Sequence, residues 1–115
     1  MNDWRDLKRM MKALSDIARL TIVYHLAHQE QEITVNALTD LLHISQPLVS
    51  WHLRRLRRAG LVETQRIGRQ VYCSLNRERF QQCLDALKGL ADPAISIASP
   101  PIGAELMEVD ATIEE

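Results

Sequence analysis

The sequence has few cysteines and no long apolar run, and both shortages exclude protein classes. Two cysteines among 115 residues are too few for a disulfide framework, and both thiols are expected to be reduced. No apolar stretch approaches the roughly 20 residues that a membrane-spanning helix requires. The first ten residues, MNDWRDLKRM, are charged and lack the apolar segment of a signal peptide. We therefore expect a cytoplasmic protein with no membrane partner.

The net charge of the whole chain is only −1, but it is the sum of two oppositely charged parts. Residues 1–92 carry a net charge of +4, and residues 93–115 carry −5. The apolar content of 46% is ordinary for a folded domain, and the length suits one domain. We therefore expect a single folded domain over residues 1–92 and an acidic, flexible tail over residues 93–115.

Apolar spacings of three and four residues predict two helices at the start of the chain. Asp3 is the expected N-cap of the first helix, and Ser15 or Asp16 is that of the second, which extends to about His28. The expected buried face of the second helix consists of Ile17, Leu20, Val23, Tyr24 and Leu26.

The next segment has the proportions of a helix-turn-helix. The β-branched residues 33–35 predict a very short strand, and Asn36 is the expected cap of a third helix. Ser45 caps the following helix, and Pro47 falls in its first turn, where the missing N–H is not needed. That helix ends just before Gly60, a residue suited to a helix C-terminus.

The hydrophobic period then changes from helical to strand-like. Residues 61–67 and 70–75 form two such runs on either side of Gly68 and Arg69, a two-residue turn in which glycine can adopt a positive φ. A hairpin directly after such a helix is a wing. Asn76 caps a last long helix, whose apolar face consists of Phe80, Cys83, Leu84, Leu87 and Leu90.

Helix 46–59 combines an apolar inner face with a polar and basic outer face. Gln46 and Ser50 lie four residues apart near its N-terminal end, where a recognition helix reaches base edges in the major groove. Its expected inner residues are Leu48, Val49, Leu53 and Leu56, and its outer arginines include Arg54 and Arg55.

Positive charge is concentrated along this helix and the wing. Residues 46–69 contain six arginines and one acid, Glu63, and such a local basic patch suits contact with phosphates. Arg66 and Arg69 at the tip of wing 62–75 are placed to touch the backbone or the minor groove, and His52 is a further donor. These features predict a protein that binds double-stranded DNA.

Three stretches of the chain resemble the ArsR/SmtB family of winged-helix transcriptional repressors. They read LSDIARLTI at residues 14–22, LLHISQPLVSWHL at residues 41–53 and LRRAGLV at residues 56–62, and the resemblance extends over about residues 5–91. It implies a mainly α winged helix-turn-helix with the order helix, helix, strand, helix, recognition helix, strand, strand, helix. It also implies a homodimer formed by the first and last helices.

The family resemblance further implies a function and a set of reading positions. Members normally repress their own operon at a palindromic operator and release the DNA when an inducer binds. The positions that would read DNA are occupied here by Ser45, Gln46, Pro47, Val49, Ser50 and His52, with the wing at Arg66–Arg69.

The sequence departs from the family at the usual inducer sites. Thr34 and Asn36 stand where many relatives hold a soft metal with cysteines, and neither supplies a thiolate. Arg77, Glu78 and Arg79 stand where other relatives begin a zinc site, and no histidine follows in that helix. A His25–His28 pair does not by itself define a site. We therefore expect no metal and no cofactor, and the inducer remains open.

Two alternative functions follow from the same residues. Cys73 and Cys83 could form a redox sensor if their sulfurs approach and their pKa values are lowered, although Cys83 on an apolar stripe also suits a core position. A winged-helix module that binds protein instead of DNA is the other alternative. An enzyme is not expected, because the sequence contains no nucleophile–base pair and no phosphate-binding glycine loop.

Overall fold

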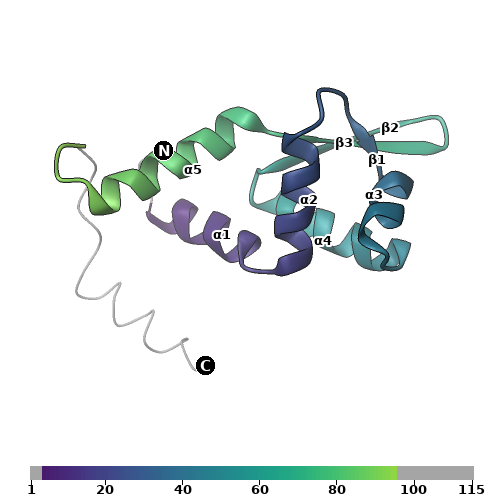
Figure 1. Ribbon diagram of the computed structural model, residues 1–115, viewed down its shortest axis with the longest axis horizontal. Coiled ribbons are helices and arrows are strands. Elements are labelled where there is room, and N and C mark those ends of the chain that lie inside the picture. Colours follow the sequence, from purple (N-terminus) through teal and green to yellow (C-terminus); the bar gives the residue numbers. More distant parts are fainter. Residues whose placement is uncertain (1–3, 96–115) are drawn as a thin grey trace.

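The computed structural model of the protein describes residues 4–95, which form five helices and three short strands (Figure 1). The predicted mainly α architecture with a hairpin wing is confirmed. None of the helices in this range is long and apolar enough to cross a membrane. In chain order the elements are α1 (Trp4–Leu14), α2 (Ile17–Ala27), β1 (Ile33–Thr34), α3 (Val35–Leu42), α4 (Gln46–Arg58), β2 (Val62–Ile67), β3 (Gln70–Leu75) and α5 (Arg77–Ala91).

Side-chain caps determine where most of these helices begin. The Asp16 carboxylate accepts the N–H groups of Ala18 and Arg19 at 2.8 and 3.2 Å, and Ser45 and Asn76 cap α4 and α5 as predicted. An oxygen acceptor at this position satisfies N–H groups that have no partner within the helix. The expected cap Asp3 and the expected tail from residue 96 onward lie outside the described residues.

The third helix begins two residues earlier than the sequence predicts. Thr34 Oγ1 accepts the Ala37 N–H at 3.1 Å, so Thr34 is the N-cap and the prediction of Asn36 is wrong. Thr34 also pairs with Tyr72 of β3. The backbone therefore passes from strand to helix without a connecting loop, and this leaves no room for a later cap.

The three strands form one antiparallel sheet in the order β1-β3-β2. The β2–β3 ladder runs from Val62 opposite Leu75 to Ile67 opposite Gln70. Gly68 has φ +63°, which matches the positive φ predicted for this two-residue turn. The hairpin extends at one end of the molecule, and α1 and α5 lie together at the other end (Figure 1).

Helices α1, α2, α3 and α4 and the sheet share one apolar core. Met10, Ile22, Leu38 and Leu56, one from each of these helices, are fully buried, as is Leu61 in front of β2. At about 1.5–3 kcal/mol for each large side chain, such residues supply the main favourable contribution to folding.

The buried face of α2 differs from the predicted one. Ile17, Leu20 and Tyr24 are exposed by 79%, 48% and 56%, so their assignment to the core is wrong. The helix instead buries Ile22, Val23 and Leu26, of which Ile22 was not predicted, together with the charged residue Arg19. Because α2 carries apolar residues on all sides, its periodicity does not identify the face that packs.

A glycine at the end of α4 lies against α5. Gly60 has φ +79°, and a Cβ at this position would lie 3.0 Å from Arg79 Nε. The next residue closes the helix, because the Leu61 N–H donates to the Leu56 carbonyl at 3.1 Å. Arg79 in turn holds Asp6 of α1 at 2.7 Å, so the absence of a side chain at residue 60 allows this bridge between helices.

We predict that Gly60→Ala destabilises the fold more than Gly68→Ala does. Both glycines have positive φ, which costs an L-residue about 1–2 kcal/mol, but a Cβ at Gly68 meets nothing within 4 Å. Displacement of Arg79 adds to the cost only at Gly60. Urea denaturation of the two variants measures the difference in the free energy of unfolding, and equal losses would show that the contact with Arg79 has no energetic weight.

Candidate nucleic-acid interface

The helix-turn-helix consists of α3, a tight turn and α4. His43 ends α3 in the left-handed region with φ 59°, and Ser45 begins α4 by accepting the Leu48 N–H at 3.4 Å. Val49, Leu53 and Leu56 are buried along one side of α4. This packing leaves the opposite side of the helix facing outward.

Most of the residues expected to contact DNA lie on this open side or on the wing. The structure leaves Ser50 half-buried. The exposed members of the expected set are Ser45, Gln46, Pro47, Arg54, Arg55, Arg66 and Arg69. Arg57 and Arg58 are exposed on α4 as well, so all six arginines of residues 46–69 are open to solvent.

Two of the expected reading positions are not on the surface. Val49 is fully buried and His52 is 5% exposed, so neither side chain can reach a base edge, and these two predictions are wrong. Leu48, which was expected inside, is instead 42% exposed. The reason is the same in all three cases, since the buried stripe of α4 is centred on Val49, His52 and Leu56, with Leu48 at its margin.

His52 belongs to a buried polar network at the junction of three helices. Arg19 Nη1 lies 3.0 Å from His52 Nδ1, and Arg19 Nε donates to the Ala13 carbonyl at 2.6 Å. Asp16 Oδ1 lies 4.0 Å from the same His52 nitrogen. The network therefore connects the end of α1, the first turn of α2 and the middle of α4.

The charge states of this network follow from burial and from neighbouring charges. Burial lowers the pKa of His52, and this effect together with the Arg19 and Arg55 charges outweighs the attraction of Asp16. Burial alone would raise the pKa of Asp16, but the Arg19 N–H, the Arg19 charge and the Ala18 N–H lower it below 3.8. A neutral His52 can accept from Arg19 through Nδ1, which leaves its proton on Nε2.

The sequence alone does not identify Arg19 and Asp16 as partners of His52 in this network. Arg19 was noted only as part of the family-like stretch, and Asp16 only as a possible cap. The signal that could have revealed Arg19 is one charged residue within an otherwise apolar run, because a charge in a core requires buried partners.

Further contacts fix α4 from its outer side. The Arg55 guanidinium carbon lies 5.0 Å from the centre of the Trp51 ring, and that of Arg19 lies 5.7 Å from it, both within the range of cation–π attraction. Arg57 Nη1 donates to Thr64 Oγ1 of β2 at 3.0 Å. The last contact ties the recognition helix directly to the wing.

Both cysteines are buried and free. Burial and the Glu32 charge raise the pKa of Cys73 to about 11, and burial raises the pKa of Cys83. Thiol–disulfide chemistry requires a thiolate that oxidants can reach, and these surroundings favour the protonated thiol. The environment of both residues is that of core positions.

The residues at the family's usual metal positions have structural roles here. Thr34 caps α3, and Arg77 Nη2 donates to the carbonyls of Leu26, Ala27 and Gln29 at 3.1–3.4 Å. Within residues 4–95, no three His, Cys, Asp or Glu side chains gather in a way that could hold a metal ion.

These features define a class of protein and then a family. The fold is that of a winged helix-turn-helix protein, and it matches the solution structure of the homodimeric winged helix-turn-helix DNA-binding domain Mb0332 from Mycobacterium bovis. That match has a TM-score of 0.60 and 27% identity over 76% of this chain and 85% of that one. Residues 16–64 match the profile of the bacterial regulatory protein arsR family.

Two curated relatives support the same assignment. The arsenic resistance transcriptional regulator ArsR1 of Pseudomonas putida is 39% identical over 92 residues, which cover 79% of this chain and 70% of ArsR1. The transcriptional repressor SmtB of Mycobacterium tuberculosis is 38% identical over 87 residues, which cover 75% of this chain and 63% of SmtB. The chain therefore belongs to the arsR family of bacterial transcriptional regulators, a non-enzymatic class, as the sequence predicts.

We predict that acidification destabilises the fold through His52. Its pKa in the folded protein lies below the ordinary value of 6.5, so the unfolded chain binds more protons as the pH falls past that value. The free energy of unfolding is therefore not reduced by His52 above about pH 6.5, and it decreases as the pH falls toward the lowered pKa. Urea denaturation between pH 5 and 8 measures this slope, which His52→Gln should abolish.

His25→Gln serves as the control for this experiment, because His25 lies on α2 outside the buried network. The control should keep the wild-type dependence on pH. Asp16 does not confuse the result, since its contribution to stability is lost only as the pH falls below about 3.8. An unchanged slope in His52→Gln would contradict the network as the origin of the effect.

We also predict that oxidation does not regulate the protein through its thiols. Cys73→Ser and Cys83→Ser leave DNA binding and its response to a mild disulfide-forming oxidant unchanged, because neither buried thiol supplies a thiolate at neutral pH. Binding is measured by fluorescence anisotropy with reduced and with oxidised protein. Weaker binding by oxidised wild-type protein alone would favour the redox sensor instead.

Proposed function

We propose that this chain is a homodimeric transcriptional repressor that reads a palindromic operator through α4 and the β2–β3 wing. The proposal is supported by the exposure of Gln46 and of the arginines on α4 and at the wing tip, with Ser50 half-buried on the same helix. Base edges are read by polar side chains, and phosphates are held by cations. Both kinds of group are exposed on α4, and further cations are exposed on the wing.

The parts of this surface have different expected tasks. Gln46 lies in the first turn of α4 and is suited to pairing with adenine, while Ser50 one turn later can bond to a base or a phosphate. Arg66 and Arg69 flank the turn of the wing and are suited to the backbone or the minor groove. The exposed Arg54 on α4 adds a phosphate contact.

A second copy of the chain is the expected partner at the other end of the molecule. Cys83 is the only residue of α5 that is fully buried, and Leu84 and Leu90 of α5 and Met11 of α1 are exposed. An amphipathic helix with so little of its apolar side covered favours association. Dimerisation through α1 and α5 would place two recognition helices on two half-sites related by a twofold axis.

Control of the chain's own operon and release by an inducer remain part of the proposal by resemblance to the family. A role on the genome places its action in the cytoplasm. The structure gives no support to a thiol inducer, and the inducer is not identified. A protein-binding module is the competing function, and the next experiment distinguishes it.

We predict that two substitutions separate base reading from phosphate contact. Fluorescence anisotropy compares a duplex from the protein's own promoter with a scrambled duplex over a range of salt concentrations. Gln46→Ala should reduce the preference for the promoter duplex by about 1–3 kcal/mol, since a base contact is lost. Arg69→Gln should weaken binding to both duplexes alike and reduce the salt slope by about 0.9.

Wild-type protein should bind with two chains per duplex at saturation. Lys8→Gln is a charge-matched control, because Lys8 is an exposed cation of α1 outside this surface. It should retain both affinities. The absence of any wild-type preference for the promoter duplex at moderate salt would overturn the proposal in favour of the protein-binding module.

A further inference from the structure

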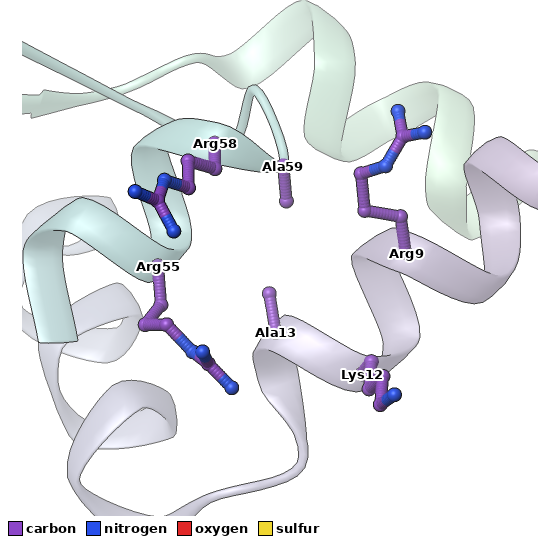
Figure 2. A pocket seen from close by; sticks show the side chains of 6 residues that line it. All are labelled: Arg9, Lys12, Ala13, Arg55, Arg58 and Ala59. Carbon is purple, nitrogen blue, oxygen red and sulfur yellow. The ribbon is translucent and has the colours of Figure 1, made fainter.

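A basic cleft lies between α1 and the C-terminal end of α4. It has a volume of about 280 Å³ and is lined by Arg9, Lys12 and Ala13 of α1 and by Arg55, Arg58 and Ala59 of α4. Figure 2 shows the two alanine side chains pointing toward one another from the two helices, with the four long cationic side chains arranged around them. Both alanines are buried, so they form the floor of the cleft.

The positive charge of this cleft is largely uncompensated. None of its lining residues is acidic. Among the lining residues, Arg9 bonds to Asp6 at 3.2 Å, and Asp6 is shared with Arg79 at 2.7 Å. Within residues 4–95, no ion pair involves Lys12, Arg55 or Arg58. Four cationic residues from two helices border the cleft and no acid lines it, so the local charge favours an anion there.

The size of the cleft restricts the anion. Sites for drug-sized molecules have volumes of about 300–1,000 Å³, and a water occupies about 30 Å³. A volume of about 280 Å³ is at the lower end of that range and is large enough for a tetrahedral oxyanion together with several waters. The donors also fit, because arginine and lysine are the residues that hold phosphate groups.

We propose that the α1–α4 cleft binds a phosphate group. Half of the cleft belongs to the recognition helix, so a backbone phosphate of bound DNA is one source, and this reading rests on the proposed function. It would make α1 a DNA-contacting helix in addition to its expected role in the dimer. Free inorganic phosphate has the same chemistry and is the second source, which would compete with DNA for the cleft.

The test uses Lys12→Gln, with Lys8→Gln as its matched control. Lys8 lies one turn earlier on α1, is also exposed and does not line the cleft. Both variants remove one surface charge, so circular dichroism should show unchanged folding. Any difference between the two variants therefore reflects the loss of a cation from the cleft and not a change in the net charge of the protein.

The DNA arm measures affinity against salt concentration in a phosphate-free buffer. If DNA supplies the phosphate, Lys12→Gln makes the salt slope shallower by about 0.9 and weakens binding roughly eightfold at 0.1 M salt. The loss is the same for the promoter and the scrambled duplex, because a phosphate contact carries no sequence information. Lys8→Gln should behave as wild type.

The second arm omits DNA and titrates inorganic phosphate against chloride at constant ionic strength. If free phosphate binds, it raises the Tm of the wild type and of Lys8→Gln in a concentration-dependent manner but not that of Lys12→Gln. An effect specific to Lys12→Gln in either arm supports phosphate binding in the cleft. The arm in which the effect occurs identifies the source of the phosphate. Identical behaviour of the two variants in both arms overturns the proposal that the cleft binds phosphate.

Failure of the proposed function gives a different result. In that case wild-type protein shows no preference for the promoter duplex, and the DNA arm refutes the repressor. The phosphate titration alone then tests whether the cleft binds phosphate, because that titration requires no DNA.

Discussion

The buried guanidinium of Arg19 is the interaction on which the arrangement of the helices depends. A charge in a core is costly unless its donors are satisfied, and here Arg19 donates to the Ala13 carbonyl and bonds to His52. Those two partners belong to α1 and α4, while Arg19 itself belongs to α2. The cost of burying the charge is therefore offset only when all three helices are in their observed places. The network therefore fixes the orientation of α4 and also contributes to the stability of the fold.

The outward face of α4 inherits its position from this inner network. His52 is buried on one side of the helix, and Arg54 is exposed two residues further on, so fixing the ring of His52 fixes the direction of the exposed side chains. Arg57 extends the constraint to β2 through Thr64. This hydrogen bond joins α4 to the wing, and under the proposed function such a connection would favour simultaneous contact with a groove and its flanking backbone. Preorganisation of this kind reduces the entropy lost on binding.

Sequence reasoning succeeded where a local rule decides the structure and failed where a long-range contact does. The caps at Ser45 and Asn76 and the turn at Gly68 depend on neighbouring residues alone, and all three were predicted correctly. The face of α2 depends on Arg19 finding a partner 33 residues away, and no local pattern contains that information. His52 was misassigned for the same reason, since a polar side chain on an Arg-rich helix suits a reading role until its buried partner is known. Thr34 shows a third case, in which strand pairing displaced a cap by two residues.

The same contacts restrict how an inducer could act. A ligand releases DNA only if it binds differently to the two states of the protein. The positions at which the family resemblance implies metal ligands are occupied here by groups that hold the fold together, Thr34 at the start of α3 and Arg77 across the end of α2. Helices α1, α2 and α4 meet at Arg19, so a change in the spacing of α1 and α4 would disturb the contact that orients α4. Under the proposed function, a change of packing at the junction of these helices would reach the outward side of α4 through Arg19 and His52.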